Sequence, residues 1–443
     1  MPINLPTALQ LSNVRPIDVV VASERLRLAV AQHKEARTLW LPSVQFGIDY
    51  FRHDGQMQDI VGNVANGNKG AFFVGAGPNL IFSISDALYG PLAAKQVVRA
   101  RQADVQAATN DSLLAVAEAY MNVQQARGEL AGAIEATRLV EELVRRSNSL
   151  SEKIIPRVEA IRIEAELARR QQIELAARER WRLASADLLR VLRLDPSVQV
   201  EPVEPPFLRV QLISLETTVD DLIAVGLSNR AELASQQALV QATLKRLKQE
   251  RIRPLVPSVL LRGAATNPAG TLSTGTFGGG PNGTIGNYGF RQDIDVLLVW
   301  QLNGMGAGQR AKVQQRRVEN ELTLTELFRI QDRIAAETSQ AFAQAELASR
   351  RVEIAERGLR LSGESAAQNL VGFGKTKTSG ELEVLLIRPQ EALAAVQALG
   401  QAYAEYYGAV TDANRAQFRL YRALGQPAQM ILCVGDRQGF GSP

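Results

Sequence analysis

The sequence predicts a mainly α-helical chain in which long helical hairpins alternate with pairs of β-strands. Two stretches without proline, 92–147 and 309–368, are dominated by Ala, Leu, Glu, Gln and Arg, which are good helix formers. Segments with β-strand character precede them in pairs, at 43–52, 71–84, 258–266 and 289–302. Because the same order of elements occurs twice, we interpret the chain as an internal duplication.

Short repeated phrases mark the two copies. The helix that runs into "LPSV" at 41–44 is echoed by one that runs into "VPSV" at 256–259. A proline-rich connector, "DPSVQVEPVEPPF", lies between the copies at 195–207. The sequence therefore predicts a first repeat, a second repeat and a poorly ordered tail, at 1–204, 205–428 and 429–443.

The proline-free stretches are too long for a globular core. Apolar and small residues from Ile330 to Leu359 recur in steps of three and four, close to a heptad seam. At 1.5 Å per residue, helices of 56 and 60 residues reach about 85–90 Å. Each long helix must therefore be followed by a turn and a second helix that runs back beside it. We expect these return helices at 155–193 and at about 381–424.

The β-like segments have one apolar face. In 289–302, Val296, Leu298 and Trp300 alternate with residues that include Asp293 and Asp295. Strands of about 9–11 residues suit a tilted passage through a bilayer, with polar side chains toward a lumen. A small soluble antiparallel sheet shows the same alternation and is the simpler interpretation of the pattern alone. Gly- and Asn-rich loops are expected at 54–70 and 267–287.

Two further points favour the membrane. The sequence contains no partner layer that could cover the apolar face of four strands. A four-stranded sheet in lipid would also leave unpaired edges, which hydrocarbon does not tolerate. Copies from several chains would then close one barrel, with eight strands from two chains or twelve from three.

Composition excludes several function classes. The 443 residues contain 50 Lys and Arg against 46 Asp and Glu, one cysteine and two histidines. This balance argues against nucleic-acid binding, and the scarcity of Cys and His argues against disulfides, zinc clusters and most nucleophile pairs. We expect no enzyme activity, cofactor or metal. Neither an 18-residue apolar run nor a signal-peptide layout is present, so the protein is either cytoplasmic or trimmed of its signal.

The stretch "NLVGFGKT" at 369–376 ends like a phosphate-binding loop. A P-loop needs Gly at its first position and a strand before it, whereas Asn369 follows a long polar helix. The better interpretation is the tip of the second helical hairpin, where Gly372 and Gly374 supply turn conformations. Its counterpart in the first repeat is "RRSNSLSEKIIP", at 145–156.

Over residues 3–427 this layout resembles the outer-membrane efflux protein family, the TolC-like channels. The resemblance lies in the opening "INLPTALQLSNVRP", the "LPSV" junctions, "AIRIEAELARRQ" at 160–171 and "VTDANRAQFRLYRALG" at 410–425. It implies a homotrimer with a twelve-stranded transmembrane β-barrel and an α-barrel tunnel through the periplasm. Such a channel is a passive, periplasmically gated duct for efflux or type I secretion. It would meet a periplasmic adaptor protein and, indirectly, an inner-membrane pump of the RND, ABC or MFS type.

The resemblance also implies candidate sites. The hairpin tips would dock the adaptor through Asn148, Ser149, Leu150, Val371, Gly372, Phe373 and Gly374. Leu150, Val371 and Phe373 would be exposed apolar contacts, unless the tips are solvated turns and Phe373 packs locally. The family's tip pattern is only loosely present, because "TKTSG" at 376–380 looks inserted.

The sheet supplies further candidates. Trp40, Phe82 and Trp300 would form an aromatic belt at the lipid interface, or else pack where strands meet helices. Asp293 and Asp295 would face the lumen and bias ion passage, or would simply be solvated. A soluble periplasmic coiled-coil adaptor or scaffold remains the alternative function.

Overall fold

The computed structural model describes residues 1–12, 16–41, 43–150, 155–262, 274–282, 284–292, 295–301, 303–379 and 382–425. It has two compact units. The hairpin unit contains Met1–Ser23, Ala103–Leu233 and the described residues from Arg329 onward. The sheet unit contains Glu24–Gln102 and Ala234–Phe328. These units each draw on both halves of the chain, so the division at residue 204 stays a prediction about the sequence. The tail at 429–443 lies outside the described residues.

The predicted long helices are present and are longer than expected. Helix α3 covers Ile84–Ser149 and α7 covers Ala307–Gly372, each with 66 residues. At 1.5 Å per residue each extends about 100 Å. Helix α3 begins before the proline-free stretch and contains Pro91 in its third turn. The return helices are α4, Arg157–Leu192, and α8, Pro389–Ala423.

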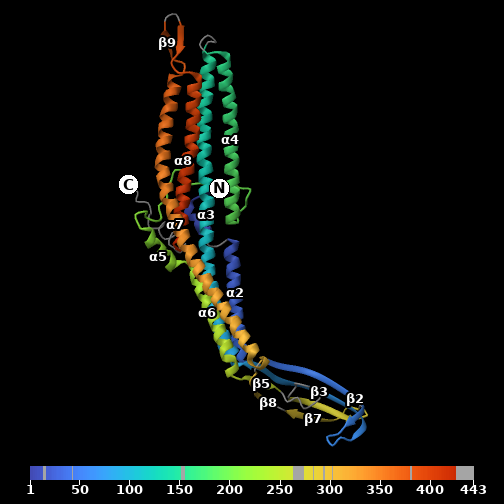
Figure 1. Ribbon diagram of the computed structural model, residues 1–443. Coiled ribbons are helices and arrows are strands. Elements are labelled where there is room, and N and C mark those ends of the chain that lie inside the picture. The colour runs from blue at the N-terminus through green and yellow to red at the C-terminus, as the bar shows by residue number, and fades with distance from the viewer. Residues whose placement is uncertain are drawn as a thin grey trace, which may run out of the picture. The chain divides into compact units, whose positions relative to one another are not determined.

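In the hairpin unit these helices pair as two antiparallel hairpins, α3 with α4 and α7 with α8 (Figure 1). One core cluster joins α3 to α4 through Val116, Tyr120 and Leu188. A second joins α7 to α8 through Ala345, Ala348 and Leu420. Shorter elements surround them: β1 (Pro2–Ile3), α1 (Leu5–Ser12), β4 (Glu201–Pro202) and α5 (Val219–Asn229). Strand β1 pairs with β4 in parallel.

Small residues let α3 and α8 approach closely. A side-chain carbon added to Gly132 would lie 2.5 Å from Tyr403, and one added to Gly128 would lie 2.6 Å from the ring of Tyr407. The two glycines stand one helical turn apart, as do the two tyrosines. Each ring therefore occupies the space that a glycine leaves open.

The sheet unit contains α2 (Ile17–Arg37) and α6 (Ala231–Ile252), both of which begin at the margin of the hairpin unit. Short 3-10 turns lead from these helices to the strands and from the last strand to α7. They are η1 (Thr38–Trp40), η2 (Arg253–Leu255) and η3 (Asn303–Gly306). The main strands are β2 (Ser43–Gln58), β3 (Val64–Ser83), β5 (Ser258–Arg262), β6 (Thr274–Pro281), β7 (Gly286–Gln292) and β8 (Asp295–Val299).

The strands form one antiparallel sheet that is four ribbons wide. β2 pairs with β3, and β5 and β6 follow each other along the opposite edge of β3. β8 pairs with β5 and β7 pairs with β6, so these two form the fourth ribbon. The sheet matches the four predicted segments in order. The prediction of a loop at 54–70 is wrong. Most of these residues belong to β2 and β3, which are joined by a turn at 59–63. Part of the loop expected at 267–287 likewise forms β6.

Candidate functional site: the sheet face and the hairpin ends

One face of the sheet is apolar and exposed. Val44, Phe46, Ile48 and Tyr50 alternate along β2 and so share one face. The side chain of Phe46 is 82% exposed and that of Ile48 is 73% exposed. Ordinary soluble sheets bury such a face, so these residues are left without a covering layer in the isolated chain.

The register carries this face across the other strands. Ile48 stands opposite Val74, Val74 opposite Thr276, and Thr276 opposite Phe290. In the same way Phe82 stands opposite Val259, and Val259 stands opposite Leu298. Exposed apolar side chains on this face of β3, β7 and β8 are Val74, Tyr288, Phe290, Val296 and Leu298.

The apolar face has a limited height. From Arg52 onward the same positions of β2 become polar, with Arg52, Asp54, Gln56 and Gln58. Arg52 and Asp54 form an ion pair at 2.7 Å. The apolar run from Val44 to Tyr50 measures about 20 Å at roughly 3.3 Å per residue. This is close to the apolar band of about 25 Å on transmembrane β-barrels.

Both outer edges of the sheet lack a strand partner among the described residues. β2 pairs with β3 alone, and β7 and β8 pair only with their inner neighbours. An unpaired edge exposes a row of N–H and C=O groups that require water or another strand. The sheet of the single chain therefore has both an uncovered apolar face and two open edges.

Aromatic residues lie where this band meets the helices. The rings of Trp40 and Phe82 have centroids 5.3 Å apart, and the indole nitrogen of Trp40 donates to the carbonyl of Ala87 at 3.1 Å. Trp40 and Trp300 are 49% and 59% exposed. The placement is compatible with both interpretations, so the lipid-interface belt stays a prediction. Tyr50 and Tyr288, at the opposite margin of the band, were missed; the change to polar residues at Arg52 could have indicated them.

The side chains of the two predicted lumen carboxylates lie outside the described part of the chain. Asp293 lies outside the described residues. Asp295 begins β8 opposite Arg262, but its side chain is outside the described part of the chain. Their role in ion passage stays a prediction.

The end of the first hairpin is a polar turn. α3 ends at Ser149, and the amide of Leu150 donates to the carbonyl of Ser147 at 3.2 Å. Asn148 and Ser149 are exposed, whereas Leu150 is half-buried and packs against the neighbouring core cluster.

The end of the second hairpin differs from the expectation in one respect. Phe373 is 3% exposed and belongs to a core cluster with Leu143, Ile163 and Val396, so the expectation of an exposed contact is wrong and the alternative, local packing of Phe373, is confirmed. The helix ends at Gly372 and Gly374 has φ +86°, so the chain turns back and carries Phe373 inward. Gly372 is required for another reason, because an added side-chain carbon would lie 2.3 Å from Ile387.

Val371 remains an exposed apolar residue of this end, at 60%. Leu386, at 58% exposed, is a second one that sequence reasoning missed. The two hairpin ends are tied together, since the Arg146 guanidinium donates to the carbonyl of Leu370 at 2.5 Å. Asn148, Ser149, Val371 and Leu386 are therefore among the exposed residues of the hairpin ends, together with polar residues such as Lys375, Thr376 and Arg388.

A small β-ribbon at this end was also missed. β9, Thr376–Ser379, pairs with β10, Leu382–Leu385, between α7 and α8. The alternation in "TKTSGELEV" around a Ser-Gly pair is typical of a hairpin and could have predicted it. The apparent insertion is therefore a defined element of the hairpin end.

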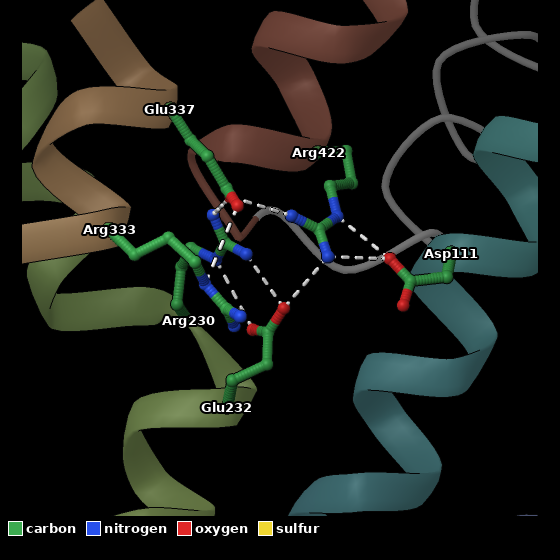
Figure 2. Close-up of polar contacts among 6 residues, drawn as sticks. All are labelled: Asp111, Arg230, Glu232, Arg333, Glu337 and Arg422. Atoms are coloured by element: carbon green, nitrogen blue, oxygen red, sulfur yellow. Dashed lines mark hydrogen bonds and ion pairs between the residues drawn. The ribbon is translucent and has the colours of Figure 1, made fainter. Parts of the chain in front are cut away.

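A charged network binds four helices of the hairpin unit together (Figure 2). The Arg230 side chain is 1% exposed and contacts Glu232 at 2.7 Å and Glu337 at 2.5 Å. Arg422 contacts the same two carboxylates at 2.9 and 3.0 Å, and Asp111 at 2.7 Å. Arg333 adds a longer contact of 3.6 Å to Glu337. These residues come from distant parts of the sequence, so no local pattern could have predicted the network.

The network affects ionisation. Burial disfavours the charge of Arg230, but hydrogen bonds and charges from Glu232 and Glu337 outweigh burial and raise the pKa of Arg230. Burial likewise disfavours the carboxylate of Glu232, yet the hydrogen bond from Arg230 prevails and lowers the pKa of Glu232. All members are matched with an opposite charge, so the network fits a structural tie between helices.

Among the described residues, no group of three or more His, Cys, Asp or Glu side chains is placed to hold a metal ion. No helix within the described ranges is both long and apolar enough to cross a membrane.

The two helical hairpins and the four-ribbon sheet together define the fold of TolC-like outer-membrane channels. The chain is similar to the outer-membrane channel OprN, with 16% identity and a TM-score of 0.74 over 96% of this chain and 90% of that chain. It is also similar to VceC of Vibrio cholerae, with 14% identity and a TM-score of 0.72 over 95% of this chain and 96% of that chain. MtrE of Neisseria gonorrhoeae in its open state gives 16% identity and a TM-score of 0.72, covering 96% and 89%.

No protein-family model and no curated protein sequence matches the chain. At this level of identity the structural similarity establishes the fold. It confirms the fold class that the sequence and its resemblance to TolC-like channels predicted.

Proposed function

We propose that the chain is one subunit of an outer-membrane channel that serves as the exit duct of a tripartite efflux pump or a type I secretion system. The observation that carries this proposal is the exposed apolar face of a sheet with two open edges. Lipid covers the face, and strands from other copies cover the edges. The channel is passive, has no enzyme activity, and lies in the outer membrane with its helices in the periplasm.

Exposed helix stripes support assembly from several copies. On α7, Leu347, Ile354 and Leu361 are exposed and stand seven residues apart. On α4, Ile161, Ala168 and Leu175 are exposed at the same spacing. A seven-residue apolar repeat is the pattern by which helices pack side by side in coiled coils. We infer that α4 of one copy packs against α7 of the next, and that the copies close a ring.

Three copies complete the ring in this proposal. β2 of one copy then pairs with the open edge of β7 and β8 in the next, which gives a closed barrel of twelve ribbons. Closure satisfies every strand edge, as hydrocarbon requires. The hairpin ends would meet a periplasmic adaptor through Asn148, Ser149, Val371 and Leu386, and the adaptor would connect the duct to an energised inner-membrane pump.

Single-channel recording in a planar bilayer tests the function. The purified protein is expected to need detergent, to be trimeric, and to give a stable conductance without an energy source. The double variant Phe46→Asp and Ile48→Asp should abolish insertion because it places charges on the lipid face. Asp49→Asn, on the opposite face of the same strand, is the matched control and should insert normally. A monomer that stays dissolved without detergent would overturn the proposal.

A further inference from the structure

The segment 199–213, which lies between α4 and α5, covers one side of the long helices. Its carbonyl groups accept hydrogen bonds from the indole nitrogen of Trp181 on α4 at 3.0 Å and from the side-chain amide of Asn414 on α8 at 2.8 Å. The same segment forms ion pairs with Arg127 on α3 at 3.2 Å and with Glu356 on α7 at 2.5 Å. This side of the hairpin unit therefore carries an additional layer of chain.

The opposite side of these helices carries charged side chains. On α3, Glu118 is nine residues from Arg127, and on α8, Arg419 is five residues from Asn414. At about 100° per residue, these separations place Glu118 and Arg419 on the sides of their helices that face away from the segment 199–213. Arg419 pairs with Glu118 at 2.6 Å, so the two helices meet along this second side. We call it the open side.

A groove of about 700 Å³ lies between α7 and α8 on the open side. Among the described residues that line it are four arginines and a single acidic residue, Asp412. The arginines are Arg350 and Arg351 on α7 and Arg415 and Arg419 on α8. Pockets of about 300–1,000 Å³ suit small organic molecules. The groove therefore has the size of a small-molecule site and a cationic lining.

The charges of the groove are unevenly paired. Arg350 and Arg419 each have a carboxylate partner, at 2.7 and 2.6 Å. Arg351 and Arg415 instead share Asp412, each at 3.4 Å, which exceeds the roughly 2.7–2.9 Å of a strong charged hydrogen bond. The Arg415 side chain is only 23% exposed, and burial lowers the pKa of Arg415 more than the charge of Asp412 raises it. A second anion beside Arg351 and Arg415 would complete the pairing.

The groove also offers apolar surface next to these guanidinium groups. Its lining includes Leu347, Ala348, Ile354 and Ala416. In the proposed channel Leu347 and Ile354 also meet α4 of the next copy, which bounds the groove on that side. A ligand that fits this lining is amphipathic, with an anionic group at one end and a short apolar body.

We propose that the groove binds small amphipathic organic carboxylates inside the duct. The inference rests on the proposed function, because a duct must keep its passage free. The layer formed by 199–213 then lies on the outside of the ring, and the open side faces the passage. The carboxylate lies between Arg351 and Arg415, whose planar guanidinium groups can each donate two parallel hydrogen bonds to it. One such site in each copy favours anionic over cationic solutes in the passage.

Equilibrium dialysis of the full chain, as trimers in an uncharged detergent at neutral pH, tests the site with 2-naphthoate as the probe. The uncharged 2-naphthamide has nearly the same shape and should bind about tenfold more weakly, because it cannot form a charge-assisted pair. Arg351→Gln, at an exposed position, should weaken 2-naphthoate binding by about tenfold. The matched control is Arg357→Gln, an exposed arginine of the same helix outside the groove, which should leave binding unchanged.

Asp412→Asn provides a test in the opposite direction. It removes the carboxylate that competes for Arg351 and Arg415, so it should tighten 2-naphthoate binding by about two- to fivefold, which a misfolded variant could not do. In single-channel recordings 2-naphthoate should cause brief blocks of the current. Trimers that conduct but bind 2-naphthoate no more tightly than 2-naphthamide would overturn the site and leave the channel function intact. Absence of any conductance would instead contradict the proposed function.

Discussion

The indole nitrogen of Trp40 donates to the main-chain carbonyl of Ala87, at 3.1 Å. In an α-helix that carbonyl would accept from the residue four positions later, which here is Pro91. Proline has no N–H group, so the acceptor is left open inside α3. Trp40 fills this gap and thereby fixes the end of α2 and η1 to the start of the long helix.

Trp40→Phe is expected to destabilise the sheet unit. Phenylalanine keeps most of the contact with Phe82 but removes the donor, which should cost about 1–2 kcal/mol for an unsatisfied buried carbonyl. Adding Pro91→Ala should restore much of the loss, because alanine supplies the missing N–H to Ala87. Thermal unfolding in detergent measures both effects. If Pro91→Ala gives no rescue, the tryptophan contributes through packing alone.

The contact of α3 with α8 makes a second prediction. Gly132→Ala should destabilise the hairpin unit by about 1–3 kcal/mol, because the new methyl group would overlap Tyr403. Gly358→Ala on α7 is the matched control, since a side-chain carbon there meets nothing within 4 Å. That change should stabilise the helix by about 0.5–1 kcal/mol through higher helix propensity. Circular dichroism of thermal unfolding reports both, and equal effects at the two sites would contradict the model of close approach.

Helix composition and strand alternation allowed the main architecture to be predicted. The seam between Ile330 and Leu359 and the alternation around Val296 reflect which side chains are buried and which are exposed, and both are periodic in sequence. The start of α3 was predicted too late because a proline usually marks a helix boundary. Here Pro91 is tolerated inside the helix, since Trp40 from another element supplies the missing hydrogen-bond donor. Residues 55–58 and 64–67 have no apolar alternation, so the sequence predicts a loop there, but the backbone pairing of two strands does not require such alternation.

The sites were less accessible to sequence reasoning. Val371 and Phe373 are two residues apart and equally apolar, yet one is 60% exposed and the other 3% exposed. The left-handed turn at Gly374 decides the difference, and it appears only in the folded chain. Arg230 and Arg422 share two carboxylates across 192 positions of sequence, a relationship that only folding creates.

Substitutions at Phe373 and Val371 are expected to have different effects, the first on stability and the second on adaptor binding. Phe373→Ala should cost about 3–5 kcal/mol of stability, because it leaves a cavity in a core cluster. Val371→Ser should leave stability within about 0.5 kcal/mol, as for other surface changes. In a pull-down with the adaptor, Val371→Ser should weaken binding, and more so when combined with Leu386→Ser. Unchanged adaptor binding by the double variant would exclude these side chains from the interface.

The Arg230 network should be a main tie of the hairpin unit. Arg230→Met removes a buried cation from two carboxylates and should cost on the order of 3 kcal/mol. Arg27→Met is the matched control, because its ion pair with Glu24 is exposed and should contribute less than about 1 kcal/mol. Chemical denaturation at neutral pH compares the two variants. Similar losses would show that the network has no special role.

The same network predicts a pH dependence. Folding lowers the pKa of Glu232 below its ordinary value of 4.5, so the folded state binds this proton less readily than the unfolded state. The resulting stability is therefore present above pH 4.5 and is lost as the pH falls through the lower folded pKa. Arg230→Met removes the main cause of the shift, so the variant should lose less stability between pH 5 and pH 3. Denaturation curves across this range test it, and parallel pH profiles for wild type and variant would contradict the assignment.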